Sequence, residues 1–341
     1  MRLRPFCRSD SSELVGLLND LDRETYEFIP WTQEHLLGEL GQAKSAVLAV
    51  DKQDRIAGLA YLRQEWWSET IGLYLQPGPE QEATGHALLA AIEPGTKTGR
   101  LTILIDPREQ GLLALFAARG YAIESTSYHM IADRDHPQST PCVAEGYRIR
   151  SIRADEEEQL IDLTRDAYNL ERLEPGVLAR WRAEDPVFDM NCVQVAEHEG
   201  SLVAVVVGCS DLEYNRHYHA HRAYLGPAAT LPHHRGKGLG KALTAQVMKI
   251  LHGLGMDTAC LYTWETNRPA LATIRDLGFR VGHEWKVLRR SLPTMRDTVN
   301  AGQDMVSDQQ TADAPVTISS LVDSDRQKQS HDALAQHQER I

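Results

Sequence analysis

The stretch YLGPAATLPHHRGKGLGKAL, from Tyr224 to Leu243, decides how the second half of the chain folds. An apolar run leads into a Gly-rich turn, and an apolar pattern with helical period follows the turn. This order predicts a strand, a loop and a helix that begins at the loop. Glycines leave room for a ligand, and the first N–H groups of a helix lack partners and attract anions. The stretch therefore predicts a phosphate-binding loop.

The loop segment RGKGLG has the spacing R-x-x-G-x-G, with Arg235, Gly238 and Gly240 at the fixed positions. A Walker loop does not fit, because it needs Ser or Thr where Ala242 stands. A dinucleotide fingerprint does not fit either, because its third glycine would fall on Lys241. A Gly-rich turn with solvated cations and no ligand is the remaining alternative from the residues alone.

The loop closely resembles the acetyl-CoA pyrophosphate loop of the GNAT N-acetyltransferase superfamily, which carries R/Q-x-x-G-x-G/A between its fourth strand and third helix. Further along, Asn267, Ala270 and the triplet 277–279 (LGF) match the superfamily pattern N-x-x-A…L-G-F that follows the fifth strand. The resemblance implies an acyltransferase that uses acetyl-CoA as co-substrate. It also implies direct attack of an amine on the thioester while both substrates are bound.

The chain repeats its own pattern of strands and helices after about 150 residues, which indicates tandem domains. We therefore expect an α/β protein, with mixed α+β sheets, built from two GNAT-like domains. Each domain should be a mostly antiparallel twisted sheet flanked by helices. The expected divisions are a domain at 1–132, a linker at 133–145, a second domain at 146–292 and a polar tail, predicted to be disordered, at 293–341.

The first copy has lost the residues that would bind acetyl-CoA. With its Gly85 aligned on Gly240, it has Glu80, Glu82 and Ala83 in the loop and Glu109 at the position of Asn267 in the later helix. Two carboxylates would repel a pyrophosphate at close range. We therefore expect the first copy to keep the fold without the cofactor, although a loop with another binding geometry is an alternative.

In the second copy the resemblance implies cofactor contacts along the end of the fourth strand, the loop and the later helix. The residues concerned are Ala229, Thr230, Leu231, Arg235, Gly236, Lys237, Gly238, Leu239, Gly240 and Asn267. The thioester oxygen should accept a hydrogen bond from the backbone N–H of Thr230 or Leu231. Strand alternation would place Tyr224, Gly226, Ala228 and Thr230 on one face.

Two residues are candidates for a catalytic role. Tyr224 lies on the fourth strand, where many superfamily members carry a Glu base, and Glu265 ends the fifth strand; simple packing is the alternative for Tyr224. The tyrosine that protonates the thiolate in many members is replaced by Ile274, but a thiol with a pKa of about 8.5 can leave unassisted, more slowly. Asp211 and Glu213 could bind a cationic acceptor or belong to a solvated loop.

The sequence does not predict a metal site. His217, His219 and His221 alternate as they would on one face of a strand, where they would line an acceptor cleft. Zinc is an alternative, but no H-E-x-x-H helix or cysteine pair accompanies them. The five cysteines show no C-x-x-C spacing and the chain starts without an apolar targeting region, so we expect a cytoplasmic protein.

The composition of the chain limits the kinds of molecule that it is expected to bind. The 36 basic and 48 acidic residues give a formal net charge of −12, which argues against a nucleic-acid or anionic-membrane partner. The most apolar run, 202–208, is too short to cross a bilayer and predicts a buried strand. We expect a small-molecule amine as acceptor and a monomer or homodimer. Two alternatives stay open: a protein lysine or N-terminus as acceptor, and a non-catalytic module that senses acetyl-CoA.

Overall fold

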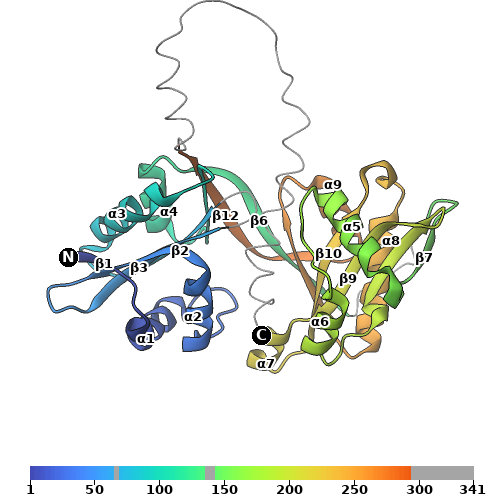
Figure 1. Cartoon of the computed structure of the whole chain (residues 1–341), viewed down its shortest axis with the longest axis horizontal. Coiled ribbons are helices and arrows are strands. Elements are labelled where there is room, and N and C mark those ends of the chain that lie inside the picture. Colours follow the sequence, from blue (N-terminus) through green and yellow to red (C-terminus); the bar gives the residue numbers. More distant parts are fainter. Residues whose placement is uncertain (65–68, 135–142, 293–341) are drawn as a thin grey trace, which may run out of the picture. The chain divides into compact units, whose positions relative to one another are not determined.

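A computed structural model of the chain describes residues 1–64, 69–134 and 143–292 (Figure 1). The predicted tail at 293–341 and most of the predicted linker at 133–145 lie outside the described residues. None of the helices in the described part is long and apolar enough to cross a membrane.

The described residues form two compact units, and two strands run through the boundary between them. Unit 1 comprises residues 1–126 and 285–292, and unit 2 comprises the described residues within 127–284. The strands β6 (Ala122–Asp133) and β12 (Arg280–Ser291) each begin in one unit and end in the other. Each half of the chain therefore supplies the end of its last strand to the other unit, which differs from the predicted division into two uninterrupted domains.

Unit 1 is a mixed sheet with helices on both faces. Its strands follow the order β1-β2-β3-β4-β5-β12-β6, and of the pairs formed by β1 to β5 only β4 and β5 run parallel. Helices α1 and α2 pack on one face and α3 and α4 on the other (Figure 1). The elements not yet given are β1 (Arg2–Pro5), α1 (Ser11–Asp22), α2 (Gln33–Gln42), β2 (Ala43–Val50), β3 (Ile56–Gln64), β4 (Glu69–Leu75), α3 (Gln81–Ile92), β5 (Arg100–Ile105) and α4 (Gln110–Ala118).

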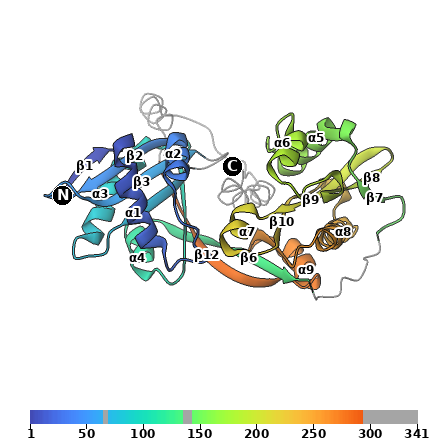
Figure 2. The same cartoon turned by 90° about the horizontal axis from the view of Figure 1, so that it is seen from below.

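Unit 2 repeats this plan, with the strand order β12-β6-β11-β10-β9-β8-β7. Helices α5 and α6 lie on one face of the sheet and α8 and α9 on the other (Figure 2). Its further elements are β7 (Arg148–Ser151), α5 (Glu157–Tyr168), α6 (Val177–Glu184), β8 (Val193–His198), β9 (Ser201–Ser210), α7 (Leu212–Tyr218), β10 (Arg222–Thr230), α8 (Leu239–Gly253), β11 (Thr258–Trp264) and α9 (Arg268–Asp276).

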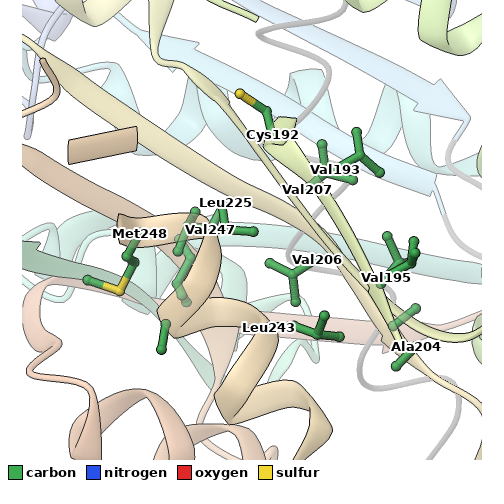
Figure 3. Packing of buried hydrophobic residues seen from close by; sticks show 14 of the residues in the cluster. Cys192, Val193, Val195, Ala204, Val206, Val207, Leu225, Leu243, Val247 and Met248 are labelled. Carbon is green, nitrogen blue, oxygen red and sulfur yellow. The ribbon is translucent and has the colours of Figure 1, made fainter. Parts of the chain in front are cut away.

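Helix α8 is held tightly against the sheet of unit 2. Its apolar positions recur with helical period, and Leu243 and Val247 are fully buried. They pack against Val206 and Leu225 of the sheet (Figure 3). The helix comes so close that a Cβ on Gly208 would lie 2.5 Å from Cγ1 of Val247. Burial of each such side chain contributes about 1.5–3 kcal/mol, and this packing fixes where the helix begins.

The predicted α/β fold with two copies of one plan is confirmed, but the segment with the three histidines was predicted wrongly. His217 lies in helix α7 and His219 has a left-handed backbone (φ 51°), so these histidines do not alternate along a strand. The side-chain amide of Asn215 bonds both the N–H and the C=O of Arg222 at 2.7 Å, which turns the chain back on itself. Among the described residues, no group of three or more His, Cys, Asp or Glu could hold a metal ion.

Candidate active site

Strand β10 has an unpaired edge next to the predicted phosphate loop. Its parallel pairing with β11 covers three positions, from Arg222 with Thr258 to Tyr224 with Cys260. Pairing with β9 continues to Thr230 on the other side. Within the described residues, backbone groups of β10 beyond Tyr224 that point towards β11 therefore have no neighbouring strand. A ligand with amide groups could pair with them, as a strand would.

The ladder with β9 decides which N–H groups point to this edge. The N–H of Leu231 donates to the C=O of Val203 at 3.0 Å, so it is already used. Residues of an antiparallel strand alternate between bonding their neighbour and pointing away from it. The N–H of Thr230 therefore points to the unpaired edge. Of the two predicted donors to the thioester oxygen, the structure leaves Thr230 available and Leu231 not.

A bulge in β10 changes the predicted faces of the strand. The register with β9 shifts between Leu225 and Ala228, where the extra residue lies. Tyr224 pairs with Cys209 and Ala229 with Val205, which places Tyr224 and Ala229 on the same face. The prediction that Tyr224 shares a face with Ala228 and Thr230 is therefore wrong.

The loop between β10 and α8 has the backbone that anion binding requires. Gly236 (φ 75°) and Gly238 (φ 78°) both have left-handed conformations, which glycine adopts without strain. Gly238 is the N-cap of α8, and no described side chain caps this helix start. A Cβ on Gly236 or Gly240 would meet nothing within 4 Å. The helix N-terminus therefore offers N–H groups to a space that is open on the loop side.

Some side chains of the loop anchor it to the rest of unit 2, and others add positive charge. Arg235 donates from Nε to the C=O of Thr230 at 3.1 Å and from Nη2 to the C=O of Ala167 at 3.3 Å. These bonds tie the loop to the end of β10 and to α5. Leu239 is buried and anchors the first turn of α8. Lys237 is exposed, so its ammonium group adds positive charge at the loop surface.

A cluster of three rings supports this loop, and sequence reasoning missed it. The hydroxyl of Tyr147 lies 2.9 Å from Nδ1 of His234, which directly precedes Arg235. The ring of His198 stacks on Tyr147 with a centroid distance of 4.5 Å. Burial lowers the pKa of His234, and the neighbouring His198 lowers it further. No local sequence signal connects these residues, because they come from three separate segments.

Tyr224 is placed on the sheet face opposite to α8, and it remains neutral. Its side chain is buried, and burial raises its pKa well above the ordinary value, against an opposing effect of Arg172. A phenol that stays protonated can donate a hydrogen bond but cannot accept a proton from an amine. The second predicted candidate, Glu265, is exposed in the turn that follows β11. Its carboxylate therefore remains accessible.

Asp211 has a structural role at the start of β10. It is buried, and its carboxylate accepts bonds from the Nε and Nη2 of Arg222 at 2.8 and 2.6 Å. The guanidinium compensates its charge, so Asp211 is neither solvated nor available to a cationic acceptor. Glu213, in the first turn of α7, has its pKa raised by burial and by the charge of Asp211.

Two residues on the α5 side of the sheet, Tyr168 and Arg172, were also not identified from the sequence. Tyr168, the last residue of α5, donates from its hydroxyl to the C=O of Ala228 at 2.6 Å. The guanidinium of Arg172 lies 4.5 Å from the centroid of the Tyr168 ring. A tyrosine in an apolar helical pattern predicts only core packing, so this contact had no signal in the sequence.

Helix α9 contains the last predicted positions. Asn267 is its N-cap, and its side chain accepts from the N–H of Ala270 at 3.4 Å. Ile274 is 5% exposed and packs in the core of unit 2. The bond of Asn267 orients the helix start, and the position that carries an acid in many superfamily members is apolar here.

The corresponding helix start in unit 1 carries acidic residues. Glu80 occupies the N-cap of α3 and Glu82 its first turn. Gly85 is the fifth residue of α3 and is buried; a Cβ there would lie 2.6 Å from Cδ2 of Leu115. It is therefore a close-packing residue and not the counterpart of a phosphate-loop glycine, as the sequence alignment assumed. Glu109 does occupy the N-cap position of α4, as the alignment predicted, but its side chain makes no capping hydrogen bond.

Comparison with known proteins agrees with this geometry. The model of the family described as "Acetyltransferase (GNAT) family" matches residues 154–279. The mycothiol acetyltransferase of Thermobispora bispora is 28% identical over 252 residues, which are 70% of this chain and 81% of that protein.

Two solved structures share the fold along most of the chain. A GCN5-related N-acetyltransferase from Sphaerobacter thermophilus aligns with a TM-score of 0.65 and 19% identity, over 86% of this chain and 96% of the other. A tandem GNAT protein from the clavulanic acid biosynthesis pathway aligns with a TM-score of 0.57 and 18% identity, over 86% and 99%. Residues 154–279 of the chain are therefore similar to the GNAT acetyltransferase family, and the chain shares the fold of a tandem GNAT protein.

Proposed function

We propose that unit 2 transfers an acetyl group from acetyl-CoA to a small-molecule amine while both substrates are bound. The loop before α8 carries the proposal, because left-handed Gly236 and Gly238 open a helix N-terminus beside Arg235 and Lys237. Helix N-termini of this kind bind phosphate groups. The pyrophosphate of acetyl-CoA would bind there, and the pantetheine arm would follow the unpaired edge of β10 to the N–H of Thr230.

Direct attack by the amine is favoured over an acyl-enzyme. Burial raises the pKa of Cys209 above its ordinary value, and Cys260 is fully buried. A thiol that stays protonated and inaccessible is a poor nucleophile. Of the two predicted bases, the exposed Glu265 remains a candidate to accept the proton of the amine, since Tyr224 is protonated.

The nature of the acceptor is supported by the relatives, several of which are named for mycothiol. Their name favours a small molecule over a protein. We further propose that unit 1 binds no acetyl-CoA, because Glu80 and Glu82 stand at its corresponding helix start.

The test is a screen for thiol release from acetyl-CoA with glucosamine, kanamycin, spermidine, and peptides with a free lysine or N-terminus. We expect turnover with at least one small amine, and one acetyl-CoA site per chain by titration calorimetry. Faster turnover with peptides would point to a protein acceptor. Absence of release with every amine would contradict the proposed function.

A further inference from the structure

Unit 2 does not have an acid at the position where the superfamily resemblance places one. Ile274 is buried and packs in the core, and its hydrocarbon side chain cannot supply a proton. The thiolate of CoA still gains from protonation as the carbon–sulfur bond breaks. A proton donor would have to reach the unpaired edge of β10 from another element.

Tyr168 reaches this edge. Its hydroxyl donates to the C=O of Ala228 at 2.6 Å. Ala228 and Thr230 are two residues apart in the regular pairing with β9, so both direct their backbone groups away from β9. The C=O of Ala228 and the N–H of Thr230 therefore point to the same unpaired edge. Two residues along a strand span about 6.6 Å. A thioester oxygen bound to the N–H of Thr230 would therefore bring its sulfur near the hydroxyl of Tyr168.

The two helices concerned approach this edge from opposite faces of the sheet. Tyr168 ends α5, whereas Ile274 lies on α9, on the other face (Figure 2). Since β10 and β11 are not paired beyond Tyr224, a sulfur atom between them can be approached from either face. An acid on α5 can thus replace one on α9.

The positive charge of Arg172 also favours Tyr168 as the proton donor. The guanidinium of Arg172 lies 4.5 Å from the ring centroid of Tyr168. This positive charge stabilises the negative charge that develops on the phenol oxygen when its proton leaves. Burial raises the pKa of the neighbouring Tyr224, and Arg172 opposes this rise. The environment of Tyr224 includes the thiols of Cys209 and Cys260 and the phenol of Tyr168.

We propose that Tyr168 is the general acid of the transfer, in place of the tyrosine absent at position 274. This inference rests on the proposed function. A pantetheine amide N–H would replace the hydroxyl as donor to Ala228, and the hydroxyl would turn to the sulfur. The amine nitrogen bonds to the acetyl carbon, the carbon–sulfur bond breaks with its electron pair on sulfur, and the phenol proton moves to sulfur. The phenolate then takes up, through solvent, the proton that the amine nitrogen loses.

The first test is Tyr168→Phe in the full chain, assayed by thiol release with the fastest amine of the screen. We expect kcat to fall roughly a hundredfold, at the low end of general-acid catalysis. The KM for acetyl-CoA should change less than about twofold, because no loop contact is lost. Tyr121→Phe is the matched control: it removes a hydroxyl bond of 3.1 Å to the buried Glu93 in unit 1 and should leave kcat unchanged.

A second variant keeps the test decisive if the phenylalanine variant folds poorly. Trifluorotyrosine at position 168 retains the hydroxyl but loses its proton at lower pH. The alkaline limb of kcat should therefore move to lower pH, whereas a purely structural role would leave it in place. An unmoved limb, or an undiminished kcat in folded Tyr168→Phe, would overturn the assignment and leave the proposed function intact. A wild-type chain that releases no thiol would overturn both.

Discussion

The backbone N–H of Leu231 donates to the carbonyl of Val203 at 3.0 Å, and this bond turns the N–H of the preceding Thr230 away from β9. We predict that Thr230→Pro lowers kcat by about a hundredfold or more, because it deletes the donor to the thioester oxygen. No ladder bond is lost, so Tm should stay close to that of the wild type. Steady-state kinetics and thermal melting check both expectations.

The control for this prediction is Thr230→Ala, which keeps the backbone N–H and changes only the side chain. It should retain nearly wild-type kcat. Equal losses in the two variants would show that the side chain of Thr230 matters and its N–H does not.

The phosphate loop should lose acetyl-CoA when it acquires the residues of the first copy. Arg235→Glu with Gly238→Ala removes a charged donor and two anchoring bonds, and places a carboxylate near the pyrophosphate. We expect binding to weaken at least roughly a hundredfold, since each 1.4 kcal/mol is tenfold. Because Gly238 has φ 78°, alanine there should also cost roughly 1–2 kcal/mol of stability. Titration calorimetry and thermal melting measure the two effects.

The reverse change in unit 1 is the matched control. Glu80→Arg with Ala83→Gly should not create a second acetyl-CoA site, because Glu82 remains in the first turn of α3 and Glu109 remains at the N-cap position of α4. If the altered unit 2 loop binds acetyl-CoA as tightly as the wild type, the pyrophosphate is held elsewhere.

Two glycines that the sequence alignment treated as equivalent should respond in opposite ways to alanine. Gly85→Ala should destabilise the protein by about 1–3 kcal/mol, because the new Cβ would lie 2.6 Å from Leu115 in the core of unit 1. Gly240→Ala meets nothing within 4 Å and should keep or slightly raise Tm, since alanine favours helix. Denaturant unfolding compares them. A larger loss of stability at position 240 than at position 85 would contradict the assigned packing.

The ring cluster beneath the loop should make stability depend on His234 in acid. Burial lowers the folded pKa of His234 below its unfolded value of 6.5, so the folded protein favours the neutral ring. The contribution of the neutral His234 ring to the free energy of unfolding is complete above pH 6.5 and is lost as the pH falls through the folded pKa. We expect the drop in Tm between pH 7.5 and about 5 to be smaller in His234→Gln than in the wild type. Tyr147→Phe, which keeps the titrating ring, should retain the pH-dependent drop.

Local patterns in the sequence were sufficient for the fold class and for the backbone of the loop between β10 and α8. The strand before Thr230, the turn at Gly236 and Gly238 and the helix from Leu239 follow from residues within about four positions of one another, through side-chain period and glycine backbone freedom. The same reasoning identified Glu109 as the counterpart of the helix cap Asn267. Short-range geometry depends on the local chain alone, which is why these features can be read directly.

The other features of the fold and of the candidate site depend on contacts between residues that are far apart in the sequence. Contacts between distant segments place the ends of β6 and β12 in the opposite units. Pairing of β10 with β9 shows the bulge after Leu225, which reverses the faces of β10. The same pairing uses the N–H of Leu231 and leaves that of Thr230 available. Burial decides that Tyr224 stays protonated, and the approach of α5 places Tyr168 on Ala228. A hydrogen-bond partner and a desolvated side chain depend on what the rest of the chain brings alongside, and no local pattern encodes that.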